Sequence, residues 1–397
     1  MLQEIWKLAK SAVVMTTPVT PVLQQASLYS NQYEWTVIGA GPAGIATVDQ
    51  LLNAGIANDK ICWIDPYFSV GDFGTCWRYV SSNTMVKRFK QFYAACASYE
   101  TKDRPSFAID SFPDHETCLL DTAAEPLRWI TENLVKKVHC VQGNVTHLSM
   151  VRQHWNVTLA DAKSYLSKNV VLAVGAKPIS LRYPRIQEIP LTVALDPYQL
   201  ENQITSSDRV AVFGSSHSAI LLLKELLNLG VSEIINFYQS PLKYAVNFED
   251  WILFDNTGLK GTTATWARDN LHGSLPRNLT RVQATPDNIA MYLTECNKAI
   301  YAVGFKPRQI KIEGLLNPIE HHPRTGIIAL GLFGVGIAFP EIKEDRLGNV
   351  ESRVGMWKFM DYLQRVMPLW LQYGMGECDA DKINVTQPEK CREVLTV

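Results

Sequence analysis

The feature that most constrains the fold is a glycine-rich turn near the start of the chain. Residues 37–44 read Val-Ile-Gly-Ala-Gly-Pro-Ala-Gly, an apolar strand that runs into a tight turn and then into an apolar helix. Gly39 permits the turn, Gly41 lets a pyrophosphate approach the backbone, and Gly44 lets the helix pack close to the strand. The helix N-terminus then faces the phosphate. This layout predicts a doubly wound α/β domain.

An acidic residue completes the pattern. A further apolar strand is expected over residues 60–64, and Asp65 and Pro66 follow it directly. A carboxylate at the end of this strand accepts hydrogen bonds from a ribose in dinucleotide-binding domains. The pattern therefore predicts a bound dinucleotide that also contacts Pro42 and Ala43. The alternative is a doubly wound domain whose turn is degenerate and binds no nucleotide.

A second unit of the same kind begins at Arg209. An apolar strand over residues 210–213 leads into the turn Gly-Ser-Ser-His-Ser-Ala, and a helix then runs to Gly230, a natural residue for a helix C-terminus. Ser216 stands where the pattern has its middle glycine, so a phosphate approaches less closely here. A structural βαβ unit without nucleotide is the alternative. The residues predicted to hold a nicotinamide nucleotide are Gly214, Ser216, His217, Ser218 and Ala219.

Two similar segments bracket the second turn. Residues 169–178 and 299–307 are both apolar strands that end in Val-Gly-x-Lys-Pro, with Gly175 and Gly304 at the matching place. This order of motifs resembles the two-dinucleotide flavoproteins, in which a nicotinamide-binding domain is inserted into an FAD-binding domain and the two strands are the crossings. The resemblance covers about residues 33–368.

The resemblance implies an α/β fold in which a Rossmann-like FAD-binding domain carries an inserted Rossmann-like NAD(P)-binding domain. The expected FAD-binding parts are residues 33–178 and 301–397, the insertion is residues 179–300, and residues 1–32 are a lead-in. FAD and NADP are the cofactors that this family uses, and Gly175 and Gly304 are expected to lie beside them.

The segment after the ribose carboxylate resembles flavin-dependent monooxygenases of the flavin-containing and Baeyer–Villiger type. Gly74, Thr75 and Trp77 form their Gly-Thr-x-Trp pattern, and residues 82–84 read Ser-Asn-Thr, like the Asn-Thr pair of the flavin-containing enzymes. By this resemblance Asn83 is the catalytic candidate, placed near flavin N5 and C4a and the nicotinamide ribose, and Trp77 covers the ring. Asn83 also suits the N-cap of a helix over residues 85–93, and both roles can hold.

The surroundings of this segment allow simpler interpretations. Arg78 either clamps an anionic ligand or makes a surface ion pair. Asp121 or Thr122 is expected to cap a helix that runs to about residue 135, and strands are expected over residues 139–150 and 154–159.

The end of the second unit bears on the choice of nicotinamide. Residues 237–243 read Phe-Tyr-Gln-Ser-Pro-Leu-Lys and hold no carboxylate to bind the ribose of NAD. Monooxygenase relatives often carry Arg-Ser-Pro here for the 2′-phosphate of NADP, but Gln239 replaces the arginine and leaves Ser240 and Lys243. NADP is favoured and NAD stays open. His217 either contacts a phosphate or the nicotinamide amide, or is exposed to solvent.

Two further departures limit the resemblance. Residues 189–199 lack the histidine of the linker fingerprint, and Ile337 stands where many reductases place the aspartate for the ribityl chain. Backbone amides after Gly336 and a helix over about residues 354–366 are expected to take that role.

Composition excludes several classes. The 397 residues carry 38 basic and 39 acidic side chains and no basic tract, which argues against nucleic acid and anionic membrane surfaces. The eight cysteines form no Cys-x-x-Cys pair and no four-residue gap, so a redox dithiol is not expected, and no metal-ligand spacing is present. Residues 326–339 are too few to span a bilayer and are expected to form a buried strand and a glycine turn. No clear signal peptide is present, which predicts a cytoplasmic location.

These observations favour an FAD- and NAD(P)H-dependent monooxygenase-like oxidoreductase. In this hypothesis NAD(P)H reduces the flavin, O2 adds at C4a to form a hydroperoxide, and one oxygen atom passes to a small substrate with a nucleophilic nitrogen or sulfur. One alternative is a flavin reductase or oxidase without a dithiol. The other is a non-enzymatic redox-sensing or interaction protein, which the changed residues Ser216, Gln239 and Ile337 favour.

Overall fold

The computed structural model describes residues 32–374. The chain divides into two units, Met1–Gln32 and Tyr33–Val397. The two large sheets described below belong to the second unit. All of the expected lead-in except Gln32 lies outside the described residues.

The first sheet has nine strands in the order β16-β4-β5-β6-β1-β2-β3, with β18 pairing with β6 and β17 with β18. β1, β2 and β3 run parallel, and Val37 is paired with Trp63 and Ile64 with Val141. β4, β5 and β6 form an antiparallel meander. The bounds are β1 Gln32–Ile38, β2 Ile61–Asp65, β3 His139–Gln142, β4 Val145–Val151, β5 His154–Leu159, β6 Ser164–Leu172, β16 Lys311–Ile312, β17 Ile327–Ala329 and β18 Leu332–Gly334.

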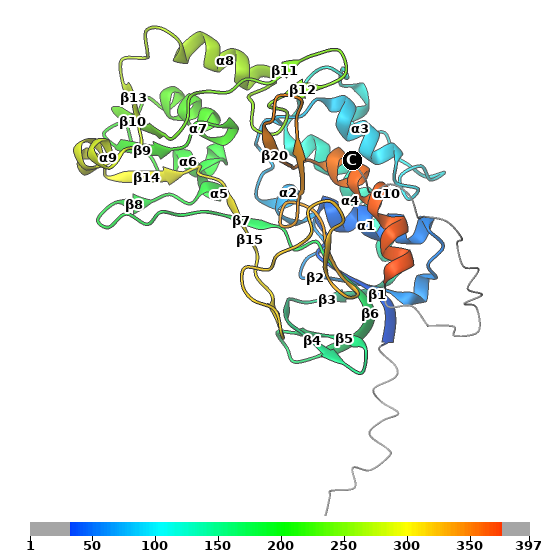
Figure 1. Ribbon diagram of the computed structural model, residues 1–397. Coiled ribbons are helices and arrows are strands. Elements are labelled where there is room, and N and C mark those ends of the chain that lie inside the picture. The colour runs from blue at the N-terminus through cyan, green and yellow to red at the C-terminus, as the bar shows by residue number, and fades with distance from the viewer. Residues whose placement is uncertain (1–31, 375–397) are drawn as a thin grey trace, which may run out of the picture. The chain divides into compact units, whose positions relative to one another are not determined.

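Four helices pack against one another beside this sheet, as Figure 1 shows. Their apolar faces and the strands enclose a core that includes the fully buried rings of Trp63, Tyr93 and Trp370. The bounds are α1 Pro42–Asn53, α3 Val86–Ala94, α4 Leu120–Val135 and α10 Met356–Tyr373; the short α2 Gly71–Thr75 and the 3-10 turns η4 Asn58–Lys60 and η5 Ala108–Ser111 lie in the connections.

The second sheet is parallel throughout, in the order β13-β10-β9-β14-β8. Its strands are β8 Gln187–Glu188, β9 Arg209–Phe213, β10 Glu233–Tyr238, β13 Leu279–Gln283 and β14 Lys298–Tyr301. One face packs on α5 Leu191–Ala194, α6 Pro197–Glu201, α7 His217–Asn228 and α8 Gly261–Leu271, and the other on α9 Pro286–Tyr292 and the 3-10 turn η6 Leu293–Glu295.

A two-stranded ribbon connects the two sheets. β7 Ala176–Pro178 and β15 Phe305–Pro307 pair antiparallel, with Phe305 opposite Pro178 and Pro307 opposite Ala176. The expected α/β architecture, with one Rossmann-like sheet inserted into the chain of another, is confirmed, while the predicted domain boundaries stay a prediction. Two further ribbons are β11 Val246–Asn247 with β12 Ile252–Leu253, and β19 Glu341–Glu344 with β20 Val350–Arg353.

Some local expectations differ from the structure. α4 begins at Leu120 with Leu119 as its N-cap, so neither Asp121 nor Thr122 caps it, because the Asp121 carboxylate binds Arg78 and Arg128. The strand expected over residues 139–150 is two strands, interrupted where Gly143 donates its amide to the Asp65 carbonyl.

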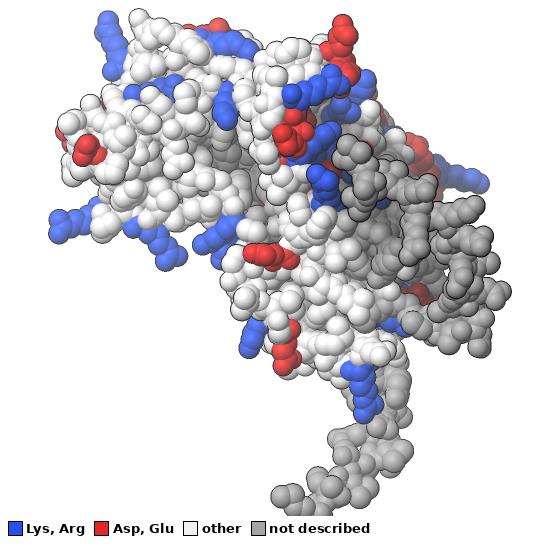
Figure 2. Space-filling model, in the orientation of Figure 1, with Lys and Arg blue, Asp and Glu red and all other residues white. Residues whose placement is uncertain are grey.

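The apolar stretch of residues 326–339 holds the β17–β18 hairpin, with Gly331 in its turn at φ +64, as expected. None of the helices in the part that the structure describes is both long and apolar enough to cross a bilayer. Figure 2 shows basic and acidic side chains interspersed over the face in view.

Candidate functional site

The first glycine turn has the steric form that its sequence predicts. Gly39 follows β1 with φ +108, and a Cβ atom there would lie less than 3.0 Å from the Ala173 carbonyl oxygen. A Cβ atom on Gly44 would lie less than 3.0 Å from the Gly39 carbonyl oxygen. Both glycines are therefore required by close backbone contacts, one with the segment after β6 and one within the turn.

Gly41 is different, because it has an ordinary φ of −77 and is the N-cap of α1. A Cβ atom there would meet only the Val70 carbonyl oxygen, at 4.0 Å, so the space above this residue is open. No side chain caps α1 and its first turn holds no acidic residue. The first amides of a helix have no acceptor within the helix, so this end of α1 presents unpaired donors.

Two more glycines bring bare backbone to the same helix end. A Cβ atom on Gly71, at the start of α2, would lie 3.1 Å from the Gly41 Cα atom, and one on Gly336 would lie 2.8 Å from the Ala43 Cβ atom. Gly336 follows β18, so the segment after this strand reaches the first turn. We call Gly39, Gly41, Gly44, Gly71 and Gly336 the first cradle; its open N-terminus suits a pyrophosphate.

Asp65 braces this cradle. Its Oδ2 atom accepts the Ala40 amide at 2.7 Å, and its Oδ1 atom accepts the amides of Tyr67 and Phe68, each at 2.8 Å. A carboxylate has about four lone-pair sites, so these three bonds leave one for a ribose hydroxyl. The ribose contact stays a prediction, and so does the role of Pro66, whose carbonyl accepts the Gln142 side chain at 2.9 Å.

The second turn repeats the steric form. Gly214 follows β9 with φ +127, and a Cβ atom there would lie less than 3.0 Å from the Ala302 carbonyl oxygen. Ser216 is the N-cap of α7, but its side chain caps nothing, so this helix end is also open. We call Gly214, Ser216, Ser218 and Ala219 the second cradle; Ser240 lies beside it, since its carbonyl accepts the Ser215 hydroxyl at 3.0 Å.

His217, at the start of α7, is only partly exposed and its ring is hydrogen-bonded, which differs from the expectation of plain solvent exposure. Its Nε2 atom lies 2.7 Å from the Ser81 carbonyl oxygen, so Nε2 carries the proton and donates. Its Nδ1 atom is buried and without a partner in the described part of the chain. Burial lowers the pKa of His217, which keeps the ring neutral and leaves Nδ1 as a free acceptor.

Asn83 does not cap α3, whose N-cap is Met85. Its Nδ2 atom donates to the Gly258 carbonyl at 3.1 Å, and its Oδ1 atom accepts the Lys260 amide at 2.9 Å. The carboxamide therefore binds the segment before α8 in the inserted part of the chain. Its predicted place beside the flavin stays a prediction.

The segment that Asn83 binds is also held from the C-terminal part of the chain, which the sequence did not indicate. Asp255 forms ion pairs with Lys260 at 2.6 Å and with Lys358 of α10 at 2.7 Å. Burial opposes the charge on Asp255, but Lys358 and Lys260 lower its pKa to about 2. Glu351 of β20 accepts the amides of residues 256 and 257, each at 3.1 Å.

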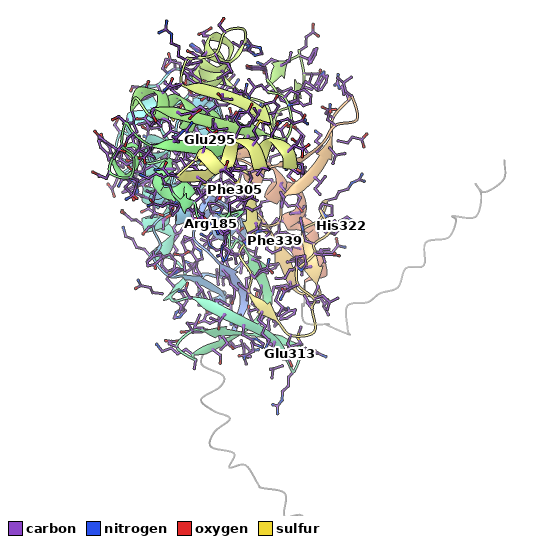
Figure 3. All side chains as sticks on the ribbon, turned by 90° about the vertical axis from the view of Figure 1, so that its left-hand side faces the viewer. Arg185, Glu295, Phe305, Glu313, His322 and Phe339 are labelled. Atoms are coloured by element: carbon purple, nitrogen blue, oxygen red, sulfur yellow. The ribbon has the colours of Figure 1, made fainter. Side chains whose placement is uncertain are left out.

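Trp77 contacts the crossing ribbon, and the adjacent Arg78 forms an ion pair at the surface. The Trp77 ring meets the Phe305 ring edge-on, with centroids 5.8 Å apart; Figure 3 labels Phe305. Arg78 binds Asp121 at 3.1 Å and is half exposed, so the surface-pair interpretation is confirmed. Gly175 and Gly304 directly precede the two strands of the ribbon, with φ values of +70 and +101.

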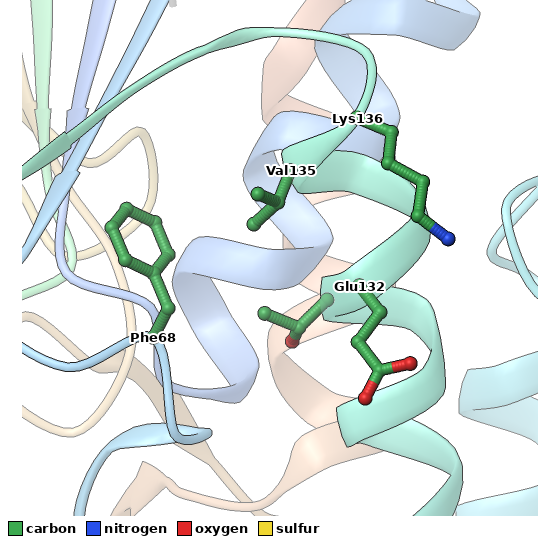
Figure 4. Close-up of a pocket in the computed structure, with 5 residues that line it drawn as sticks. Phe68, Glu132, Val135 and Lys136 are labelled. Atoms are coloured by element: carbon green, nitrogen blue, oxygen red, sulfur yellow. The ribbon is translucent and has the colours of Figure 1, made fainter.

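Two pockets lie outside the cradles. One, of about 430 Å³, is lined by Phe68, by Thr131, Glu132 and Val135 of α4, and by its C-cap Lys136 (Figure 4). The other, of about 590 Å³, lies at the start of α8. Neither is lined by a residue of the two glycine turns. The cradles are open backbone surfaces beside helix ends.

The two cradles and the inserted sheet define a class: the two-dinucleotide flavoproteins, as the sequence predicts. No family model matches the chain. The chain is 34% identical over 381 residues to the monooxygenase AgnR1 of Paecilomyces divaricatus, a match that covers 84% of this chain and 97% of that protein. The chain belongs to the family of this monooxygenase and is a monooxygenase-like oxidoreductase.

Solved structures show the same fold at lower identity. A flavin-containing monooxygenase from Stenotrophomonas maltophilia is 15% identical with a TM-score of 0.58, covering 86% of this chain and 99% of that one. OTEMO, solved in complex with FAD and NADP, is 11% identical with a TM-score of 0.53, covering 86% of this chain and 98% of that one.

Proposed function

We propose that this protein is an FAD- and NADPH-dependent monooxygenase that transfers one oxygen atom of O2 to a nitrogen or sulfur atom of a small substrate. The other oxygen atom leaves as water, and NADPH supplies the two electrons. The observation that carries the proposal is the pair of uncapped helix ends, α1 and α7, each preceded by a glycine at positive φ in close contact with a crossing segment. A cytoplasmic location remains part of the proposal.

The first cradle holds FAD. The open N-terminus of α1, with Gly41, Pro42 and Ala43, receives the pyrophosphate, and the free lone pair of Asp65 receives a ribose hydroxyl. Ile337 carries no acceptor, so the backbone amides after Gly336 bind the ribityl chain. FAD, when bound, supplies the hydride acceptance and the oxygen chemistry that side chains cannot.

The second cradle holds NADP. Ser216, Ser218 and Ala219 at the start of α7 receive its pyrophosphate. The buried Nδ1 atom of His217 is a neutral acceptor, which suits an N–H donor such as the nicotinamide carboxamide and not a phosphate oxygen. Of the two ligands expected for His217, we therefore propose the amide.

Asn83 and Trp77 act at the reacting edge. Asn83 is the proposed catalytic residue, since its carboxamide can both donate and accept a hydrogen bond. To bind the cofactor, it gives up its hydrogen bond to Gly258 or Lys260 and forms one to the cofactor instead. Trp77, packed on Phe305, shields the site from water.

Anaerobic stopped-flow absorbance tests this function. The purified yellow protein is expected to bleach with NADPH, faster than with NADH, and to recolour in air while a thioether or tertiary amine gains ¹⁸O from ¹⁸O2. Recolouring with one peroxide released per NADPH and no labelled product would identify a reductase or oxidase instead. Protein that neither nicotinamide bleaches would have the non-enzymatic sensing or interaction role.

A further inference from the structure

The carboxyl end of β10 lies where an adenosine ribose is bound in a unit of this kind. β10 ends at Tyr238, and the exposed Gln239 and Ser240 follow. These positions carry neither an acid for a free 2′-hydroxyl nor a cation for a 2′-phosphate. The selectivity of the second cradle must therefore come from another element.

Arg281 of the neighbouring strand β13 reaches this end of the sheet. It is paired with Asn236 of β10, and its Nε atom donates to the Asn236 Oδ1 atom at 2.9 Å. The Asn236 Nδ2 atom donates in turn to the carbonyls of Val212 at 3.0 Å and Gly214 at 2.8 Å. One buried amide thus connects the arginine to the glycine turn of the second cradle.

Among the described residues, no carboxylate pairs with Arg281. Its guanidinium lies over the Tyr238 ring, 5.2 Å from the centroid, and within residues 32–374 it forms no ion pair and donates from neither terminal nitrogen. Burial lowers the pKa of Arg281, and no carboxylate is among the groups that act on it electrostatically. A partly buried cation without a counter-ion is unfavourable, so an anionic ligand would stabilise it.

A second guanidinium lies beside Tyr244. Arg268 of α8 is stacked over the Tyr244 ring, 4.3 Å from its centroid. Arg268 and Arg281 both act on Tyr244 electrostatically and lower its pKa against the effect of burial, which raises it. Both cations therefore lie near Tyr244, and Arg281 also lies over Tyr238, the last residue of β10.

We propose that Arg281, assisted by Arg268, binds the 2′-phosphate of NADP and makes the second cradle selective for NADPH over NADH. The terminal nitrogens of Arg281 form the donor fork that a phosphate accepts. This assignment rests on the proposed function, since it requires a nicotinamide nucleotide on α7. The selectivity for NADPH then depends on Arg281 of β13, and not on residue 239, where relatives have an arginine and this chain has a glutamine.

Calorimetric titration of the FAD-loaded protein with 2′,5′-ADP and with 5′-AMP tests the assignment without turnover. The wild type is expected to bind 2′,5′-ADP at least about tenfold more tightly. The variant R281Q is expected to lose roughly 10- to 100-fold in affinity for 2′,5′-ADP while 5′-AMP binding stays within about twofold. R281K retains part of the preference. R277Q, at an exposed arginine just before β13, is the matched control and changes neither affinity.

The outcomes separate the two proposals. A wild type that binds neither nucleotide would contradict the nucleotide site on α7, and with it the proposed function. Equal binding of the two nucleotides, or an R281Q variant that still discriminates, would overturn the role of Arg281 and leave the cradle intact. If R281Q loses 5′-AMP as well, or unfolds, R268Q on the exposed side of α8 decides: a several-fold loss of 2′,5′-ADP affinity alone supports the phosphate site, and an unchanged affinity overturns it.

Discussion

The two cradles have the same steric arrangement at their glycine turns and differ in the charge of the side chains beside those turns. Gly39 and Gly214 both turn at positive φ beneath a carbonyl of a crossing segment, Ala173 in one case and Ala302 in the other. A polar side chain from the second strand braces each turn. In the first it is Asp65, which binds backbone donors, and in the second it is Asn236, which binds backbone acceptors and holds Arg281.

Backbone geometry and ligand selectivity are therefore set by different residues. The glycines make room for a pyrophosphate in both places. An anionic residue at the strand end then suits a ribose with free hydroxyls, and a cationic residue suits a phosphorylated ribose. Paired substitutions in the two cradles can separate these two contributions.

The largest effect is expected for Gly44→Ala, compared with Gly41→Ala. The new Cβ atom at residue 44 would meet the Gly39 carbonyl oxygen at less than 3.0 Å, so the variant should lose about 3 kcal/mol of stability or fail to retain flavin. At residue 41 the nearest atom is 4.0 Å away, so the fold should persist and only FAD affinity should fall. Denaturant unfolding and the flavin content measure both. Equal destabilisation would contradict the two roles.

Next comes Asp65→Asn, compared with Asn236→Ala. An amide at residue 65 has one acceptor atom for the three backbone amides that the carboxylate binds, so we expect a loss of about 2 to 3 kcal/mol and weaker FAD binding. Loss of the Asn236 side chain should instead weaken 2′,5′-ADP binding and leave FAD in place. Urea unfolding and the two titrations test this pair; a change of FAD content in Asn236→Ala would show that the cradles are not independent.

Acid should destabilise the inserted part of the chain, which holds Asp208 and Asp255, because both carboxylates form ion pairs there. Asp208 is bound by Lys298 at 2.8 Å, which with its other donors lowers its pKa to about 2 against the effect of burial, and Asp255 has a pKa of about 2 beside Lys358 and Lys260. These carboxyls have a lower pKa in the folded state, so their contribution is present above about pH 4 and is lost as pH falls toward 2. After allowance for solvent screening, the two carboxylates together contribute on the order of 2 kcal/mol.

Unfolding free energies measured between pH 5 and pH 2.5 test this prediction. Asp255→Asn should flatten the fall in stability over that window, and Asp161→Asn, at an exposed ion pair between β5 and β6, is the control that should flatten it much less. A wild type whose stability is constant over the window would disprove the contribution of the buried pairs.

The smallest structural effect is expected for Asn83→Ala. It removes the hydrogen bonds to the Gly258 carbonyl and the Lys260 amide, which are worth about 1 to 2 kcal/mol together. Its effect on function should be larger: more peroxide released per NADPH and less labelled product. Asn83→Asp keeps the acceptor for the Lys260 amide and separates the two roles. Coupling equal to wild type in Asn83→Ala would leave Asn83 with a structural role alone.

Much of the framework was predictable because it depends on local sequence. A positive φ at Gly39, Gly214 or Gly331 and the helix end at Gly230 are constraints that one residue places on its own backbone. The strand pattern over residues 154–159 predicted β5 with the bounds it has, and the two Val-Gly-x-Lys-Pro segments predicted the crossing ribbon. Helix caps were less predictable, since Asp121 binds Arg78 and Arg128 instead of α4.

Two glycine turns, each between an apolar strand and an apolar helix, follow from the amino-acid sequence alone, because the φ of a glycine and the period of a strand or helix are local properties. The contacts that the side chains of each site make became known only from the folded chain. Asn83 binds Lys260 across 177 residues, His217 meets Ser81 across 136, and Arg281 reaches Asn236 across 45. These contacts depend on strand register and on the packing of distant segments, which set where a side chain ends and which charges it meets.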